Sequence, residues 1–315
     1  MERGYLCQHT IGREVRCGGV GLHSGADVSM KLRPAAPNHG IRFRRTDICD
    51  HPTIIATANQ VVDTRLATTI GFDGVVVSTI EHLMAALSGI GVDNVLVELD
   101  GPEVPIFDGS ADAYVRVIEE AGLRRQNAPR RFLKVAKPML IADGDAYIKA
   151  TPWAHFVVQY SIDFPHPLVG RQEFSWSFNR TRFGRDIARA RTFGFLRDVE
   201  HLQSRGLARG GSLANAMVFD DHRLLNHEGF RYSDECVRHK VLDFVGDLAL
   251  AGRPLLGRFE VHKAGHALHN RFLKHLLAGD GLNGSPMPTC MPKPYFQAMP
   301  IPTVLDCFPP VAKVL

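Results

Sequence analysis

The sequence lacks the features that mark several classes of protein. Its six cysteines include no Cys-x-x-Cys pair, and their spacing suggests no disulfide ladder. No apolar run approaches the roughly 20 residues that span a bilayer, and the first residues lack the apolar core of a signal peptide. We therefore expect reduced thiols, no transmembrane segment and a cytoplasmic location.

A strong charge imbalance is also missing. Lys and Arg number 37 against 33 Asp and Glu, which gives a net charge of +4. This excess is too mild to predict binding to nucleic acid or to an anionic membrane, and it suits a protein with a local site for an anion. With 315 residues, 45% of them hydrophobic, the chain is long enough for two domains.

The common catalytic signatures are absent as well. There is no Walker loop and no Gly-x-Ser-x-Gly elbow, and Gly19-x-Gly21 lacks the third glycine of a dinucleotide fingerprint. His227-Glu228 begins like a zinc protease motif, but the second His does not follow. Any chemistry must come from residues that the fold brings together.

One predicted helix carries a polar stripe. Its buried face is formed by Val237, Val241, Leu242, Val245 and Leu248. On the same helix His239, Asp243 and Asp247 recur every four residues. A His and a carboxylate one turn apart can reach a single cation, although a surface ion pair with solvated aspartates explains the same spacing.

A second predicted helix opens with Glu81-His82. Ser78 followed three residues later by Glu81 fits a capping box, and the residues alone favour this structural role for Glu81. An acid beside an imidazole at a helix N-terminus also fits catalysis, because the helix dipole favours a carboxylate there.

The chain is predicted to form two similarly built domains. Residues 78–122 and 233–277 share the order helix with His, glycine turn, strand and helix. We predict an α/β (α+β) fold in which strands and helices recur in the same order in both domains. The predicted divisions are 1–127, 128–280 and a proline-rich tail over 281–315.

Collected together, His82, His239 and Asp243 form the ligand set of a hydrolytic zinc site, namely two neutral imidazoles, a carboxylate and an open position. Such an ion polarises an amide or ester carbonyl and lowers the pKa of water. Glu81 would accept the water proton and His266 would protonate the leaving amine.

Four further residues complete this hypothesis. Asp247 would orient His266 and raise its pKa, and Thr192 would hydrogen-bond the oxyanion. Lys240 and Lys263 would meet phosphate.

Six blocks stand in the order that one known family shows. They are Gly21-Leu22-His23-Ser24-Gly25, Ser78-Thr79-Ile80-Glu81-His82-Leu83, Phe107-Asp108-Gly109-Ser110-Ala111, Ala190-Arg191-Thr192-Phe193-Gly194-Phe195, Arg238-His239-Lys240-Val241-Leu242-Asp243 and Gly265-His266-Ala267-Leu268. From about Glu14 to Leu277 the chain resembles the UDP-3-O-acyl-N-acetylglucosamine deacetylases, which perform the first committed step of lipid A synthesis in Gram-negative bacteria.

The resemblance implies a two-domain α/β fold in which each domain is a β-sheet layer packed with α-helices, with the active site between the domains. It also implies the same roles for the residues collected above. Zinc would be held by His82, His239 and Asp243, which also accept Fe²⁺. Glu81 would be the general base and His266 the general acid. Thr192 would donate to the oxyanion, and Asp247 would be the partner of the acid.

Substrate contacts are implied too. Lys240 and Lys263 would lie in the glucosamine and diphosphate region, while the aromatic contacts fall on Phe164, Phe193 and Phe195. The acyl passage would be the insertion at 196–219, whose apolar residues alone fit a small satellite core equally well. Arg65 departs from the family, where a smaller or apolar residue is expected, and would alter the entrance to the site.

The leading hypothesis is therefore a monomeric zinc hydrolase acting on a small molecule. It would remove the N-acetyl group from UDP-3-O-[(3R)-3-hydroxyacyl]-N-acetylglucosamine and release acetate. The alternatives are a metal-dependent amidohydrolase of the same fold with another substrate, and a non-catalytic nucleotide-sugar binding module. The intact set of acid, base and ligand residues argues against the last.

Overall fold

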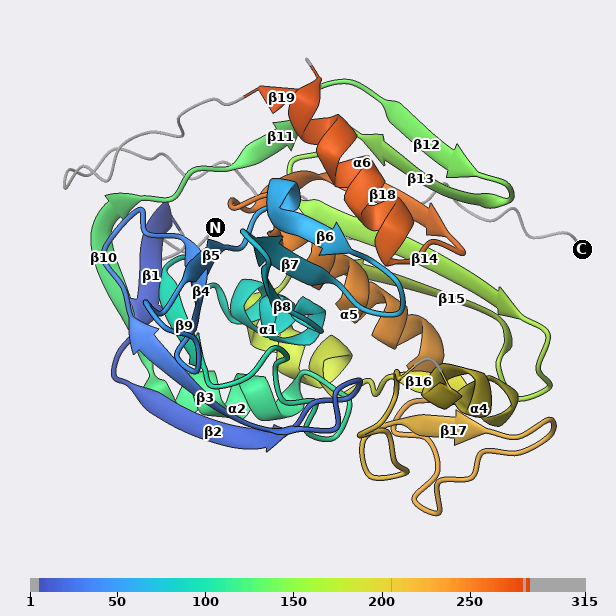
Figure 1. The fold of residues 1–315 in the computed structure, drawn as a ribbon. Coiled ribbons are helices and arrows are strands. Elements are labelled where there is room, and N and C mark those ends of the chain that lie inside the picture. The colour runs from blue at the N-terminus through green and yellow to red at the C-terminus, as the bar shows by residue number, and fades with distance from the viewer. Residues whose placement is uncertain (1–5, 205, 280–281, 284–315) are drawn as a thin grey trace, which may run out of the picture.

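The computed structural model describes residues 6–204, 206–279 and 282–283. Two halves, each with a sheet and helices, lie side by side, and helices α1 and α5 meet between them (Figure 1). This arrangement confirms the predicted fold class. Apart from Leu282–Asn283, the predicted proline-rich tail lies outside the described residues.

The N-terminal half is built on a sheet with the strand order β2-β3-β9-β4-β5. Its strands are β2 (Val15–Val20), β3 (Asp27–Pro34), β4 (Ile41–Arg45), β5 (Thr53–Ile55) and β9 (Val95–Leu99), and its helices are α1 (Glu81–Ile90) and α2 (Asp112–Ala121). A separate antiparallel pair joins β1 (Cys7–Ile11) to β10 (Leu123–Pro129). The predicted boundary between residues 127 and 128 falls inside β10, and it stays a prediction.

The C-terminal half is built around β18 (Leu255–His262), which runs parallel to β14 and antiparallel to β13. The other strands of this sheet are β11 (Leu133–Val135), β12 (Met139–Asp143), β13 (Ala146–Thr151), β14 (Phe156–Phe164), β15 (Gly170–Ser177) and β19 (Leu282–Asn283). Its long helices are α5 (Glu235–Ala249) and α6 (His266–Ala278). The order α5-β18-α6 repeats the order α1-β9-α2, as the sequence predicts.

Smaller units extend from the two sheets. The strands are the antiparallel β6 (Val61–Asp63), β7 (Thr69–Phe72) and β8 (Val75–Val77) and the parallel pair β16 (Phe193–Phe195) and β17 (Met217–Phe219). The helices are α3 (Arg180–Phe183), α4 (Leu196–Ser204), the 3₁₀ helix Ala58–Gln60 and the π-helix Gly184–Ala188. Phe219, at the end of the insertion, packs on Phe195, which precedes it, with ring centroids 5.8 Å apart, as in a small satellite core. None of the described helices is long and apolar enough to cross a membrane.

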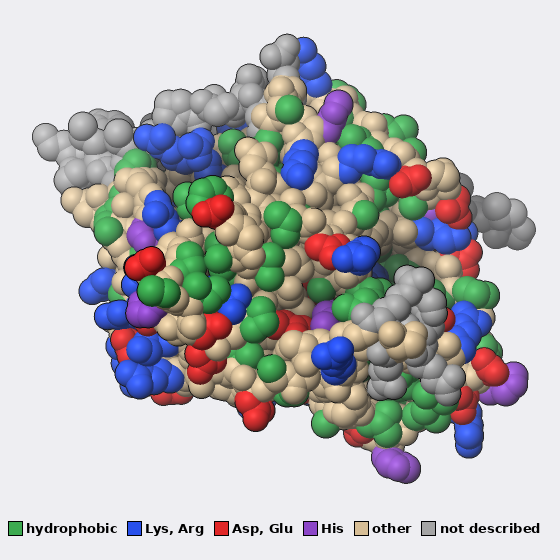
Figure 2. All heavy atoms as spheres, viewed as in Figure 1, with side chains coloured by type: hydrophobic (Ala, Val, Ile, Leu, Met, Phe, Trp, Pro, Cys, Tyr) green, Lys and Arg blue, Asp and Glu red, His purple; other side chains and the backbone are tan. Residues whose placement is uncertain are grey.

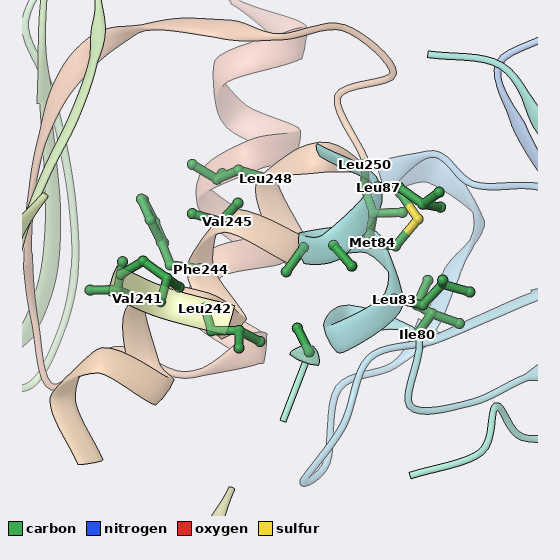
Figure 3. Close-up of a cluster of buried hydrophobic side chains, with 14 of the residues drawn as sticks. Ile80, Leu83, Met84, Leu87, Val241, Leu242, Phe244, Val245, Leu248 and Leu250 are labelled. Atoms are coloured by element: carbon green, nitrogen blue, oxygen red, sulfur yellow. The ribbon is translucent and has the colours of Figure 1, made fainter. Parts of the chain in front are cut away.

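The two central helices face opposite ways with their apolar side chains. Leu83, Met84 and Leu87 of α1 point away from α5, and Val241, Phe244 and Leu248 of α5 point away from α1 (Figure 3). Between the helices the backbones approach closely, because a Cβ on Gly246 would clash with the carbonyl oxygen of Glu81. Glycine is therefore required at residue 246 for α1 and α5 to meet, and this contact brings Glu81 and His82 against the polar stripe of α5.

Candidate active site and metal centre

Three buried side chains converge where α1 meets α5. His82 Nε2 lies 3.6 Å from Asp243 Oδ1, and His239 Nε2 lies 3.3 Å from the same oxygen. Their candidate ligand atoms all lie within 4.8 Å of one another. Among the described residues, Asp243 Oδ1 has no hydrogen-bond partner although it is buried. A buried carboxylate oxygen facing two imidazole nitrogens fits a bound divalent cation.

The charge states of these groups also suit a cation. Burial lowers the pKa of His239 to about 3 despite the neighbouring Asp243, so the imidazole is neutral and keeps a lone pair. Burial alone would raise the pKa of Asp243, but His239 and Lys240 bring it well below its usual range. Lys240 Nζ donates to Asp243 Oδ2 at 2.8 Å, which leaves Oδ1 for the ion.

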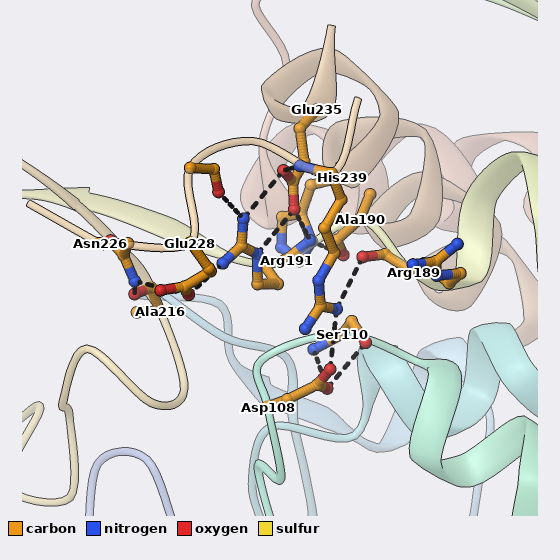
Figure 4. A network of polar contacts seen from close by, with 12 residues as sticks. Asp108, Ser110, Arg189, Ala190, Arg191, Ala216, Asn226, Glu228, Glu235 and His239 are labelled. Carbon is orange, nitrogen blue, oxygen red and sulfur yellow. Dashed lines mark hydrogen bonds and ion pairs between the residues drawn. The ribbon is translucent and has the colours of Figure 1, made fainter. Parts of the chain in front are cut away.

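The tautomer of His239 is set by the chain around Ala190. His239 Nδ1 lies 3.0 Å from the Ala190 carbonyl oxygen and donates to it, so Nε2 is the nitrogen that faces the cation site. Next along the chain, Arg191 is buried and its Nε donates to Glu235 Oε1 at 2.8 Å, while its Nη1 donates to Glu228 at 2.6 Å (Figure 4). This ion-pair network fixes the carbonyl that orients the ligand.

The predicted acid and its partner are in contact. His266 Nδ1 lies 2.7 Å from Asp247 Oδ2. Burial alone would lower the pKa of His266, but Asp247, Glu81 and Asp243 together raise it to about 9. Near neutral pH this imidazole therefore carries the proton that a general acid needs.

Glu81 also lies in this cluster, and its predicted capping role is wrong. Helix α1 begins at Glu81 without a side-chain cap, and the Ser78 N–H bonds the Pro102 carbonyl oxygen instead. The Glu81 carboxylate accepts the Thr68 N–H at 3.0 Å. Burial raises the pKa of Glu81, although His266 and His82 oppose the shift. A buried carboxylate with a raised pKa is suited to take up a proton.

Thr79 explains why the capping spacing fails. Its φ of 59° is in the left-handed region, which is strained for a β-branched residue. Glu103, which is buried, accepts the Thr79 hydroxyl at 2.7 Å and the backbone N–H groups of His23 and Ser24. The strained turn is thus connected through Glu103 to the loop at residues 21–25. It redirects the Glu81 side chain toward the site.

Sequence reasoning missed three residues that hold the acid and base. Thr68 links the base to the partner of the acid. Its N–H donates to the Glu81 carboxylate, and its Oγ1 donates to Asp247 Oδ1 at 2.6 Å. His269 places Nδ1 2.7 Å from Asp247 Oδ2, and Tyr160 lies behind it. The spacing of His269, three residues after His266 on one helix, is a signal that could have found it. Thr68 and Tyr160 carry no such signal.

The candidate metal ligands, the acid and the base line a cleft of about 520 Å³. Figure 2 shows the surface hollowed near the middle of the view, with a His side chain visible there. The cleft is lined by residues of both halves, including Glu81, His82, Thr192, His239, Asp243 and His266. Thr192 is fixed by its backbone, whose N–H bonds the Gly109 carbonyl oxygen at 2.7 Å.

The predicted substrate residues are only partly gathered in this cleft. Lys240, Lys263 and Phe193 line it. Lys263 Nζ also bonds Asp145 at 2.6 Å. Phe164 and Phe195 are not among the described lining residues and pack behind Phe193, at centroid distances of 5.4 and 6.4 Å.

Neither Arg65 nor the described part of the predicted acyl passage lines this cleft. Arg65 pairs with Asp63 at 2.7 Å, and its neighbours Thr64 and Leu66 line the cleft in its place. No described residue between 196 and 219 contributes to the lining.

The fold and site together define a metal-dependent hydrolase, with two imidazoles, a carboxylate, an acid and a base in one cleft. Residues 8–278 match the family described as UDP-3-O-acyl N-acetylglycosamine deacetylase (LpxC), and the chain belongs to this family.

Relatives named "UDP-3-O-acyl-N-acetylglucosamine deacetylase" are similar over most of the chain. The protein of Myxococcus xanthus (strain DK1622) is 52% identical over 271 residues, which cover 86% of this chain and 86% of the relative. That of Acidithiobacillus ferrooxidans (strain ATCC 53993 / BNL-5-31) is 53% identical over 272 residues, covering 86% and 90%. That of Histophilus somni (strain 129Pt) is 47% identical over 273 residues, with the same coverage.

Proposed function

We propose that this protein is a zinc-dependent deacetylase that removes the N-acetyl group from UDP-3-O-[(3R)-3-hydroxyacyl]-N-acetylglucosamine and releases acetate, the committed step of lipid A biosynthesis. The observation that carries the proposal is the convergence of His82, His239 and the bare Asp243 Oδ1 beside Glu81 and His266. The names of the relatives supply the substrate.

The ion would be held by His82 Nε2, His239 Nε2 and Asp243 Oδ1. When bound, zinc supplies a Lewis acid that polarises the amide carbonyl and makes water more acidic. This donor set also accepts Fe²⁺, and we propose zinc because two imidazoles and one carboxylate with an open position are typical of its catalytic sites.

Proton transfer is assigned to the two buried groups in the cleft. Glu81 accepts the proton of the attacking water, since burial raises the pKa of its carboxylate. His266 donates the Nε2 proton to the leaving nitrogen, because its Nδ1 is engaged by Asp247. Thr192 donates its hydroxyl to the oxygen that gains negative charge in the tetrahedral state.

Substrate positioning is assigned to residues around the cleft. Lys240 and Lys263 line it and supply positive charge for the diphosphate. Phe193 lines it as well, with Phe164 and Phe195 packed behind. The acyl chain would follow the apolar insertion at 196–219, where Leu196 and Leu213 are exposed. We propose that the chain acts as a monomer in the cytoplasm.

Metal analysis combined with a deacetylation assay tests this function. Purified protein should release acetate from the acylated UDP-N-acetylglucosamine and contain one zinc per chain. His82→Ala and Asp243→Ala should lose the metal and the activity together, while the exposed Arg65→Ala should keep both. Full metal content in both ligand variants would remove the assignment, and release of acetate only from other amides would point to a different substrate.

A further inference from the structure

The carboxylate behind the acid is shared by two imidazoles. Asp247 accepts hydrogen bonds from three described side chains, namely Thr68 at Oδ1 and both His266 and His269 at Oδ2. Burial alone would raise the pKa of Asp247, but the two histidines lower it to about 2. The carboxylate is therefore ionised and only accepts, so Nδ1 of each histidine must carry a hydrogen.

His269 is held on its other side as well. Its Nε2 lies 3.1 Å from the Tyr160 hydroxyl, which donates to the Ala264 carbonyl oxygen at 2.6 Å. The residue is 1% exposed, and its ring packs on Phe244 with centroids 5.1 Å apart. With a contact at each nitrogen and aromatic packing on its face, this imidazole cannot turn away from Asp247.

We propose that His269 is a positioning residue for the acid: through its bond to Asp247 Oδ2 it fixes that carboxylate against His266 and shares its negative charge. This inference rests on the proposed function, in which His266 protonates the leaving nitrogen. The charged or titratable groups that act on His266 are Asp247, Glu81, Asp243, His269 and His23. Those that act on His269 are Asp247, His266 and Asp243, with the Tyr160 hydroxyl against its Nε2.

Loss of the His269 contact has a defined consequence for the acid. Without a second donor, the charge of Asp247 acts on His266 alone, so the pKa of His266 rises. The basic limb of the pH profile of kcat/KM should move up by about 0.5 to 1 unit, the scale of one hydrogen bond. The rate at neutral pH should fall roughly 10-fold, because a weaker acid is held less firmly.

Two variants separate positioning from the filling of space. In His269→Asn the amide nitrogen stands about where Nδ1 stood, so the contact to Asp247 is kept and that to Tyr160 is lost. In His269→Gln the nitrogen stands about where Nε2 stood, so the opposite contact is kept. Both remove similar volume from a buried site, so a purely structural role predicts similar effects. The proposal predicts a near-normal profile for His269→Asn and the shifted profile for His269→Gln.

Imidazole ¹⁵N NMR gives a readout that does not depend on turnover. In the wild-type protein at neutral pH, His269 Nδ1 should appear protonated, and the titration of His266 should move to higher pH in His269→Gln but not in His269→Asn. Zinc content and thermal unfolding verify that each variant is intact. If the variants do not fold, the protonation state of His269 Nδ1 in the wild-type spectrum still tests the positioning role.

Failure of this inference is distinct from failure of the proposed function. A wild-type protein without deacetylase activity refutes the function, whereas the NMR titration still tests His269. Equal pH profiles for the two variants, or an unprotonated Nδ1 on His269 in the wild type, would overturn the positioning role.

Discussion

The substitution Gly246→Ala tests whether the close contact between α1 and α5 assembles the site. In Gly246→Ala the added Cβ meets the Glu81 carbonyl oxygen, and it also lies 3.1 Å from the Glu81 Cα. These are backbone atoms that cannot rotate aside, so α1 and α5 must separate. The residues moved by this separation are Glu81 and His82 on one helix and Asp243 and Asp247 on the other.

The expected loss of stability follows from two opposing effects. Overpacking of a tight contact costs about 1–3 kcal/mol, and replacing glycine by alanine within a helix recovers up to about 1 kcal/mol. We expect a net loss of about 1–2 kcal/mol in the free energy of unfolding, measured by urea denaturation. Zinc affinity should fall as well, because His82 moves relative to His239 and Asp243.

Gly184→Ala is the matched control. Its backbone is right-handed helical, with φ −56° and ψ −44°, and an added Cβ there meets only a Val115 methyl at 4.0 Å. This variant should gain about 0.5–1 kcal/mol and keep its zinc. If Gly246→Ala is as stable as Gly184→Ala and retains one zinc per chain, the close helix contact does not assemble the site.

Three further outcomes are expected. The kcat/KM of the wild type should fall above pH about 9, because the pKa of His266 is raised from its ordinary value near 6.5 and the acid loses its proton only there; a basic limb near pH 6.5 would remove His266 as the acid. Asp247→Asn should keep the metal but move this limb to lower pH, since burial then acts without the opposing carboxylate; an unmoved limb would show that Asp247 does not tune the acid. Glu81→Gln should keep the metal while kcat falls about 100-fold or more, and unchanged turnover would leave Glu81 with a structural role.

The helices that carry the chemistry could be predicted from the sequence because their patterns are local. The apolar spacing predicts a helix around His239 and Asp243, and α5 (Glu235–Ala249) confirms it. The helix predicted at the end of residues 233–277 is likewise present, as α6 (His266–Ala278). The contact between α1 and α5 could not be predicted in this way, because it depends on the absence of a side chain at Gly246 opposite a residue far away in the sequence.

The role of Glu81 shows where local reasoning fails. The spacing from Ser78 to Glu81 satisfies the capping pattern, but Thr79 adopts a left-handed conformation held by Glu103. A contact across 24 residues therefore overrides the local pattern. Thr68 was missed for the same reason, since its link to Asp247 spans 179 residues and nothing in its neighbourhood marks it.

The most direct test of the central claim is a metal titration of deacetylation. The protein is stripped of metal by exhaustive chelation, and acetate release from the acylated UDP-N-acetylglucosamine is followed as zinc is returned. Activity should vanish with the metal and recover in proportion to zinc, up to one equivalent per chain, and the His82→Ala variant should not recover. Activity that survives complete removal of metal would contradict the account.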